Sequence, residues 1–173
     1  MTIDELKVLV RDVPDFPQEG IVFKDLMPLI GNAEAFHATV EHLAVWARPH
    51  RPDVILGAEA RGFIFGGALA YELGCGFVPA RKPGKLPWEK IRATYELEYG
   101  SDALEIHADA IESGQRVLIV DDLIATGGTA AAVANLVGKM GGTLVGLAFL
   151  VELEFLKGRE RLAGHDVVSV LTY

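Results

Sequence analysis

The chain has 173 residues, of which 50% are hydrophobic and 23% are charged, a composition typical of one globular domain with a sizeable core. Its net charge of −8 argues against a nucleic-acid partner and against binding to an anionic membrane, and no apolar run reaches the length of a membrane span. The single cysteine excludes an internal disulfide framework, and the N-terminal residues are not those of a signal peptide, so we expect a cytoplasmic protein.

The N-terminal part of the chain predicts two helices joined by an irregular arm. Thr2 and Glu5 have the spacing of a capping box before a short amphipathic helix. Residues 21–30 predict an apolar arm without regular structure, because prolines and a glycine interrupt the chain just before it. Asn32 then predicts the N-cap of a second helix.

Beyond this arm, strand patterns and helix patterns alternate along the chain. Apolar or alternating runs predict strands at 54–58, 76–80, 94–99, 103–107, 117–120, 144–152 and 167–172. Helical periodicity predicts helices at 62–73, 130–140 and 153–162. The alternation predicts an α/β fold, in which helices flank a central, mostly parallel sheet within a single domain over residues 1–173.

The segment 117–129, VLIVDDLIATGGT, carries the strongest functional signal. A buried strand leads into two carboxylates and then into a short loop of small residues at a helix start: Asp121, Asp122, Ala125, Thr126, Gly127, Gly128 and Thr129. Ligands of open α/β sheets bind at the carboxyl ends of strands, and such a loop leaves backbone N–H groups to bind a phosphate. Because the carboxylates would repel that phosphate, we expect them to bind sugar hydroxyls or a hydrated cation. The alternative is that an acidic pair before a glycine turn is turn chemistry alone.

A run of basic residues follows the strand predicted at 76–80. The run consists of Arg81, Lys82, Lys85, Lys90 and Arg92. A charge run is usually only a solvated face, but prolines, a glycine and a tryptophan interleave this one, which favours a loop. Its charge would help an acidic chain to bind an anionic substrate.

The segment 117–129 resembles the phosphoribosyl-diphosphate-binding loop of type I phosphoribosyltransferases, and four further regions narrow the resemblance to the adenine phosphoribosyltransferases. They are similar to that family's base-binding arm (15–23), pyrophosphate loop (57–66), flexible catalytic loop (81–87 with 94–100) and C-terminal hood (151–159). The resemblance therefore implies a small hood formed by about 13–30 and 151–173, and a flexible catalytic loop over about 81–100.

The resemblance implies purine salvage: transfer of the 5-phosphoribosyl group from phosphoribosyl diphosphate to adenine, which gives AMP and pyrophosphate. The carboxylates of Asp121 and Asp122 would stabilise an oxocarbenium-like ribose, and residues 125–129 would bind its 5′-phosphate. Glu98 would be the general acid/base at N7 of adenine, and Tyr99 would close over the site. Without the resemblance, Glu98 would be interpreted as an ordinary solvent-facing strand residue.

The remaining implied contacts concern the base, the pyrophosphate, the metal and a second subunit. The base would be bound by Val22, Phe23, Lys24 and Leu153, although Phe23 and Leu153 also fit plain core positions. The pyrophosphate would be bound by Glu59, Ala60, Arg61, Arg81, Lys82 and Lys85, with Arg61 also counted as catalytic. Mg²⁺ would be held mainly by substrate oxygens and water, with Asp121 as an outer-sphere neighbour. The family also implies a homodimer whose subunits share basic loop residues.

This sequence departs from the family pattern at two places. Lys24 stands where an arginine is common, and it loses the planar fork of a guanidinium. Glu59 and Ala60 stand where Asp-Ser also occurs, and the family implies a cis peptide bond between them.

Two alternatives remain open at this stage. One is a phosphoribosyltransferase for another base, which would share the loop at 117–129. The other is a non-catalytic regulator that senses phosphoribosyl diphosphate. The sequence contains neither GxxxxGK[ST] nor GxGxxG after a strand, which argues against a kinase or a dinucleotide-binding enzyme.

Overall fold

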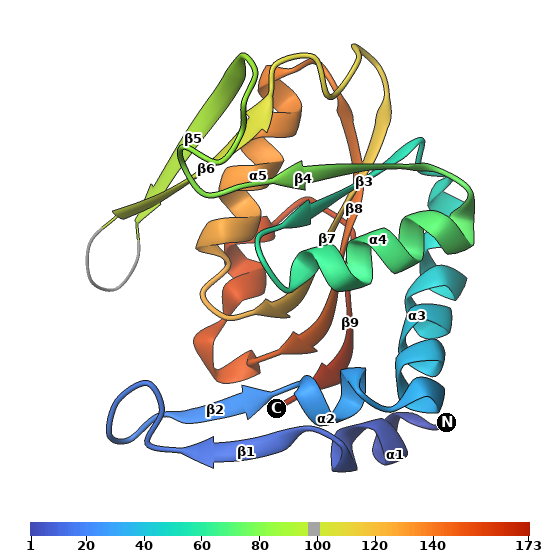
Figure 1. Cartoon of the computed structure of the whole chain (residues 1–173), viewed down its shortest axis with the longest axis vertical. Helices are drawn as coiled ribbons and strands as arrows, with labels where there is room; N and C mark the ends of the chain where they lie inside the picture. The colour runs from blue at the N-terminus through green and yellow to red at the C-terminus, as the bar shows by residue number, and fades with distance from the viewer. Residues whose placement is uncertain (97–100) are drawn as a thin grey trace.

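A five-stranded parallel sheet forms the centre of the protein, in the strand order β4-β3-β7-β8-β9. The structure, a computed structural model, describes residues 1–96 and 101–173. The strands are β3 (Val54–Ala58), β4 (Gly76–Ala80), β7 (Arg116–Ile124), β8 (Thr143–Glu152) and β9 (Val167–Thr172). Helix α5 (Gly128–Lys139) covers one face, and α3 (Ala33–Ala47) and α4 (Gly62–Leu73) cover the other (Figure 1). The predicted fold class is therefore confirmed.

Burial on both faces explains why the central strands are continuously apolar. Val117 and Ile119 of β7 pack in the same cluster as the buried side chains of α5. Leu118 and Val120 alternate with them and pack in the cluster that holds α3 and α4. Because both faces are covered there, each position from Val117 to Val120 is apolar, as is usual in parallel sheets.

Two antiparallel ribbons lie outside the central sheet. The strands β1 (Arg11–Pro14) and β2 (Val22–Asp25) form the first ribbon, which lies near the C-terminus of the chain (Figure 1). The strands β5 (Lys90–Glu96) and β6 (Ser101–His107) form the second, and its buried Leu104 and Ile106 share the α5 side of the core. The short helices α1 (Ile3–Val8) and α2 (Met27–Ile30) flank the first ribbon.

Several predicted elements are confirmed. The strands at 54–58, 76–80 and 167–172 and the helix at 62–73 have the predicted bounds. The Asn32 side chain accepts a hydrogen bond from the backbone N–H of Ala35, as expected of an N-cap. Within the described residues, the helices are too short or too polar to cross a membrane.

Other predictions were wrong in extent or type. The arm at 21–30 is regular: β2 pairs with β1, and α2 follows. The four-residue strands β1 and β2 show no apolar alternation that would have revealed them, since β1 is mostly exposed and β2 is mostly half-buried. The helix predicted at 153–162 is two 3₁₀ turns, η2 (Glu154–Leu156) and η3 (Gly158–Leu162), because the backbone between them enters the left-handed region at Lys157, where φ is 52°.

Two strands, β5 and β7, extend four residues beyond a predicted bound. β7 continues to Ile124, through the acidic pair, because its pairing with β8 continues as far as Glu152. β5 begins at Lys90, so regular structure occupies part of the loop predicted over about 81–100. Both extensions are set by the partner strand, which a local sequence pattern does not reveal.

Candidate active site

The end of β7 and the start of α5 enclose a pocket of about 210 Å³. Six predicted site residues line it: Asp121, Ala125, Thr126, Gly127, Gly128 and Thr129. The loop turns through Gly127, where φ is 78°. The pocket thus has the predicted form, with small residues between a strand end and a helix N-terminus that favours an anion.

The start of η3, at Gly158, packs closely against this loop. A Cβ atom on Gly127 would lie 2.3 Å from the carbonyl oxygen of Gly158, and one on Gly158 would lie 2.3 Å from that of Ala125. Only glycines permit so close an approach of the two backbones. The start of η3 therefore fixes the conformation of the loop.

The acidic pair lies at the edge of the pocket beside the start of α4. Asp121 lines the pocket, whereas Asp122 is 6% exposed. The Oδ1 atom of Asp121 accepts a hydrogen bond of 2.9 Å from the backbone N–H of Asp122, and it lies 2.6 Å from the position that a Cβ on Gly62 would occupy. Burial and the neighbouring charge of Asp122 raise the pKa of the Asp121 carboxyl well above its usual value.

Arg61 connects the acidic pair to the N-terminal arm. Its Nε atom lies 2.6 Å from Oδ2 of Asp122, and its guanidinium carbon lies 5.3 Å from the ring centroid of Phe23. No donor among the described residues is aligned for a hydrogen bond to that Oδ2, so the contact is electrostatic. Phe23 in turn packs edge-on against Phe16, with the ring centroids 5.2 Å apart. A continuous line of contacts therefore runs from β7 to β2.

The predicted pyrophosphate residues centre on Glu59, whose peptide bond to Ala60 is cis, as expected. The Glu59 carboxylate lies 2.5 Å from the Lys85 ammonium nitrogen and 3.4 Å from Nε of Arg81, and it accepts a 2.8 Å hydrogen bond from the backbone N–H of Lys82. Burial alone would raise the pKa of Glu59, but the donors from Lys85, Lys82 and Arg81 lower it to about 2. Glu59 therefore forms ion pairs with two of the predicted cationic side chains, Arg81 and Lys85.

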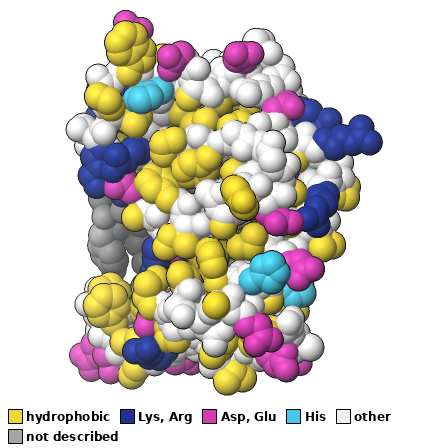
Figure 2. Space-filling view, turned by 45° about the vertical axis from the view of Figure 1, so that its right-hand side comes forward, with side chains coloured by type: hydrophobic (Ala, Val, Ile, Leu, Met, Phe, Trp, Pro, Cys, Tyr) yellow, Lys and Arg dark blue, Asp and Glu magenta, His cyan; other side chains and the backbone are white. Residues whose placement is uncertain are grey.

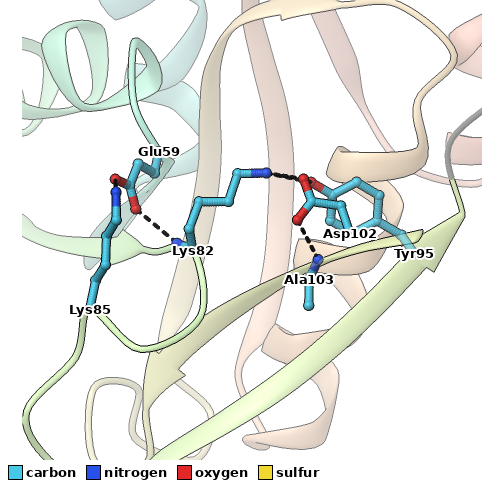
Figure 3. A network of polar contacts seen from close by, with 6 residues as sticks. All are labelled: Glu59, Lys82, Lys85, Tyr95, Asp102 and Ala103. Atoms are coloured by element: carbon cyan, nitrogen blue, oxygen red, sulfur yellow. Dashed lines mark hydrogen bonds and ion pairs between the residues drawn. The ribbon is translucent and has the colours of Figure 1, made fainter. Parts of the chain in front are cut away.

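The side chain of Lys82 does not join this cluster. Its ammonium binds the carboxylate of Asp102 on β6, and the hydroxyl of Tyr95 on β5 lies 3.4 Å from the ammonium nitrogen (Figure 3). Sequence reasoning did not identify Asp102 or Tyr95, since an aspartate and a tyrosine in strand-like segments carry no distinctive signal.

The predicted base contacts divide between two sides of β2. Val22, Lys24 and Leu153 line a second pocket of about 630 Å³, together with Tyr173. The Lys24 ammonium lies 2.6 Å from Oδ1 of Asp12 and 4.0 Å from the ring centroid of Tyr173. Phe23 lies toward Arg61 instead, as the alternation of a strand requires.

Two predicted catalytic residues, Glu98 and Tyr99, lie outside the described residues. In the sequence they come between the end of β5 at Glu96 and the start of β6 at Ser101. Within 1–96 and 101–173, no group of three or more His, Cys, Asp and Glu side chains has the arrangement of a metal cluster.

Comparison with known proteins agrees with this site. Residues 30–170 match the family model described as the phosphoribosyl transferase domain. The adenine phosphoribosyltransferase of Solibacter usitatus is 58% identical over 169 residues, which are 98% of each chain. The crystal structure of the adenine phosphoribosyltransferase from Thermoanaerobacter pseudethanolicus matches with a TM-score of 0.97 and 53% identity, over 99% of this chain and 100% of that one.

A third relative has been crystallised with ligands. The adenine phosphoribosyltransferase of Saccharomyces cerevisiae, in complex with adenine and D-2,5-dideoxy-2,5-imino-altritol 1,6-bisphosphate, matches with a TM-score of 0.93 and 45% identity, over 98% of each chain. The two structural likenesses cover essentially the full length of the chain, including both ribbons and the loop at 125–129. The chain therefore belongs to the phosphoribosyltransferase family, and within it to the adenine phosphoribosyltransferases.

Proposed function

We propose that this chain transfers the 5-phosphoribosyl group of phosphoribosyl diphosphate to adenine, with release of AMP and pyrophosphate, at the site between β7 and β2. The observation that carries the proposal is the line of contacts from Asp122 through Arg61 to Phe23. It places an acidic pair suited to a ribose next to an aromatic ring suited to a purine. The yeast relative crystallised with adenine and a bisphosphate supports this pairing of ligands.

The phosphate loop would bind the 5′-phosphate of the substrate. The small residues of 125–129 leave room beside the helix N-terminus, where backbone N–H groups and the hydroxyls of Thr126 and Thr129 would donate to phosphate oxygens. Gly158 supports the loop from behind, so the donors are already in place before the substrate binds. Such preorganisation reduces the entropy that binding must remove.

The acidic pair would stabilise the ribose as the glycosidic bond breaks. Positive charge develops at C1 in this displacement, and fixed carboxylates close to it lower the energy of the transition state. Burial, together with the neighbouring charge of Asp122, raises the pKa of Asp121, and a cationic ribose nearby would favour its charged form. Arg61 contacts Asp122 at 2.6 Å, and its charge would also attract the leaving pyrophosphate.

Base binding and proton transfer complete the proposal. Adenine would lie against Phe23 on the Arg61 side of β2, with the backbone of Val22 beside it. Lys24, as a polar neighbour, and Leu153 would contribute from the pocket that they line on the other side of β2. Glu98 would act as general acid/base at N7, and Tyr99 would close over the site. Arg81, Lys82 and Lys85, with Glu59 and Ala60, would surround the pyrophosphate.

The donor set also fits Mg²⁺ as the cofactor. Asp121 faces the pocket, and its repulsion with Asp122 makes a nearby divalent cation favourable. The ion would be held mainly by substrate oxygens and water, with Asp121 as an outer-sphere neighbour. Its chemistry is to neutralise charge on the leaving pyrophosphate.

We propose further that the active form is a cytoplasmic homodimer. Exposed apolar side chains on α3 and α4 support an interface: Val45 is 63% exposed, Tyr71 is 90% exposed and Ile64 is 37% exposed. Figure 2 shows hydrophobic side chains spread across one face of the protein. A second copy would cover such a surface. On dilution below the dimer affinity, specific activity should fall, and a fully active monomer would exclude a shared site.

A panel of bases tests the assignment of the substrate. The purified protein, with phosphoribosyl diphosphate and Mg²⁺, should release pyrophosphate with adenine far faster than with guanine, hypoxanthine, xanthine, uracil or orotate. Turnover of guanine without turnover of adenine would support the other-base alternative. Tight RNA or DNA binding at physiological salt without AMP formation would support the regulator.

A further inference from the structure

The side chain of Lys82 points away from the cluster formed by Glu59, Arg81 and Lys85. Its backbone N–H donates to Glu59, but its side chain extends in the opposite direction and ends at Asp102 (Figure 3). The three basic residues of this segment are therefore divided between two carboxylates that belong to different parts of the fold. One carboxylate follows β3, and the other lies on the β5–β6 ribbon.

Two further hydrogen bonds orient the carboxylate of Asp102. It stands opposite Tyr95 in the ribbon and accepts a 3.2 Å hydrogen bond from the Tyr95 hydroxyl. Its other oxygen accepts a 2.7 Å hydrogen bond from the backbone N–H of Ala103. The ammonium of Lys82 lowers the pKa of Asp102, so the pair is fully charged at neutral pH.

The pair is not needed to hold the ribbon together. β5 and β6 are paired along their length, from Lys90 and His107 to Glu96 and Ser101. An additional bridge between Arg81 and Glu105 connects the segment after β4 to β6 through two backbone hydrogen bonds of 2.8 Å. The ribbon is therefore joined by backbone contacts that do not involve the side chain of Asp102.

We infer that Asp102 is a positioning residue that competes with the pyrophosphate group of the substrate for the ammonium of Lys82. The inference rests on the proposed function. A pyrophosphate beside Arg81 and Lys85 gains the charge of Lys82 only after that side chain leaves Asp102. The free energy needed to open the pair is subtracted from the binding of phosphoribosyl diphosphate, so the carboxylate of Asp102 sets the affinity of the protein for this substrate.

The substitution Asp102→Asn tests the inference. Asparagine keeps the size and the acceptor oxygen but removes the charge. The Kd of phosphoribosyl diphosphate with Mg²⁺, measured by calorimetry, and the Kd of inorganic pyrophosphate should both fall by about three- to ten-fold, the range expected for a partly exposed ion pair. The KM for phosphoribosyl diphosphate should fall with them, while the KM for adenine stays unchanged.

Two controls distinguish competition for Lys82 from a general effect of net charge, and a second substitution at Asp102 guards against a folding defect. Asp109→Asn removes the same charge from an exposed turn and should leave both dissociation constants unchanged. In a Lys82→Met background, Asp102→Asn should have no effect, because the group for which it competes is gone. If Asp102→Asn does not fold, Asp102→Ser removes the same carboxylate with a smaller side chain.

An unchanged or weaker affinity in the Asp102 variant would overturn the inference, as would an equal gain in the Lys82→Met background. The binding measurement does not depend on turnover. If the wild-type protein binds phosphoribosyl diphosphate but forms no AMP, the proposed reaction fails while the competition for Lys82 is still decided. If the wild-type protein does not bind phosphoribosyl diphosphate at all, both fail.

Discussion

Glu59 is expected to contribute stability that disappears in acid. Its folded-state pKa of about 2 lies well below the value of 4.5 for an unperturbed glutamate. A depressed folded-state pKa means that the contribution is fully present above pH 4.5 and is lost as the pH falls from 4.5 toward 2. Removal of this charge should therefore destabilise the protein at neutral pH more than in acid.

The full shift corresponds to roughly 3 kcal/mol at neutral pH. The side chains of Lys85 and Arg81 are 49% and 33% exposed, so solvent screening reduces the effect. We expect Glu59→Gln to lower the free energy of unfolding by about 1 to 2 kcal/mol at pH 7. Glutamine retains an acceptor for the backbone N–H of Lys82, so the loss comes mainly from the charge.

Urea denaturation at pH 7 and at about pH 3 measures this difference between the wild type and Glu59→Gln. The destabilisation should shrink to less than half at the lower pH, because the wild-type carboxylate is then largely protonated in the unfolded chain and its stabilising contribution falls. Glu41→Gln, at an exposed position of α3, should change stability by less than about 0.5 kcal/mol at either pH. An equal destabilisation by Glu59→Gln at both pH values would refute the electrostatic reasoning.

Three further predictions concern the loop and the chemistry. Gly127→Ala should destabilise the protein by about 3 kcal/mol in thermal or urea unfolding, because its Cβ would meet the carbonyl of Gly158. Gly138→Ala, in open space on α5, should be neutral or slightly stabilising. If both variants changed stability equally, the close approach of Gly127 to Gly158 would not explain the loss. Glu98→Gln should lower kcat by roughly 10² or more with little change in substrate dissociation constants, and a kcat within a few-fold of wild type would remove Glu98 as the acid/base. Asp122→Ala should weaken both the binding of phosphoribosyl diphosphate and turnover, whereas an unaltered titration would place Asp122 outside the site.

The sequence predicted those parts of the fold that local physical chemistry determines. The strand at 54–58 and the helix at 62–73 have strong patterns, since burial on both faces demands apolar strands and the helix packs on them through small residues. The position of the loop at 125–129 was also predictable, because small residues follow a buried strand and precede a helical pattern. The close packing of Gly158 against this loop was not predictable, since it depends on contact between two segments that are far apart in the chain.

The distribution of charge in the site could not be predicted from residue types. Lysines and arginines in one loop suggested a single cationic surface, yet Lys82 pairs with Asp102 and Lys85 with Glu59. Tertiary folding decides which carboxylate each cation meets, and the relevant partners lie 20 or more positions away in sequence. Similarly, the ribbon of β1 and β2 depends on pairing between two short strands that carry no pattern individually.

A crystal structure of the protein with bound AMP is the most direct test of the central claim that one continuous site runs from the phosphate loop to the N-terminal arm. We predict the phosphate at residues 125–129, the ribose hydroxyls at Asp121 and Asp122, and the adenine ring against Phe23. AMP bound elsewhere, or with its base turned away from Phe23, would contradict it.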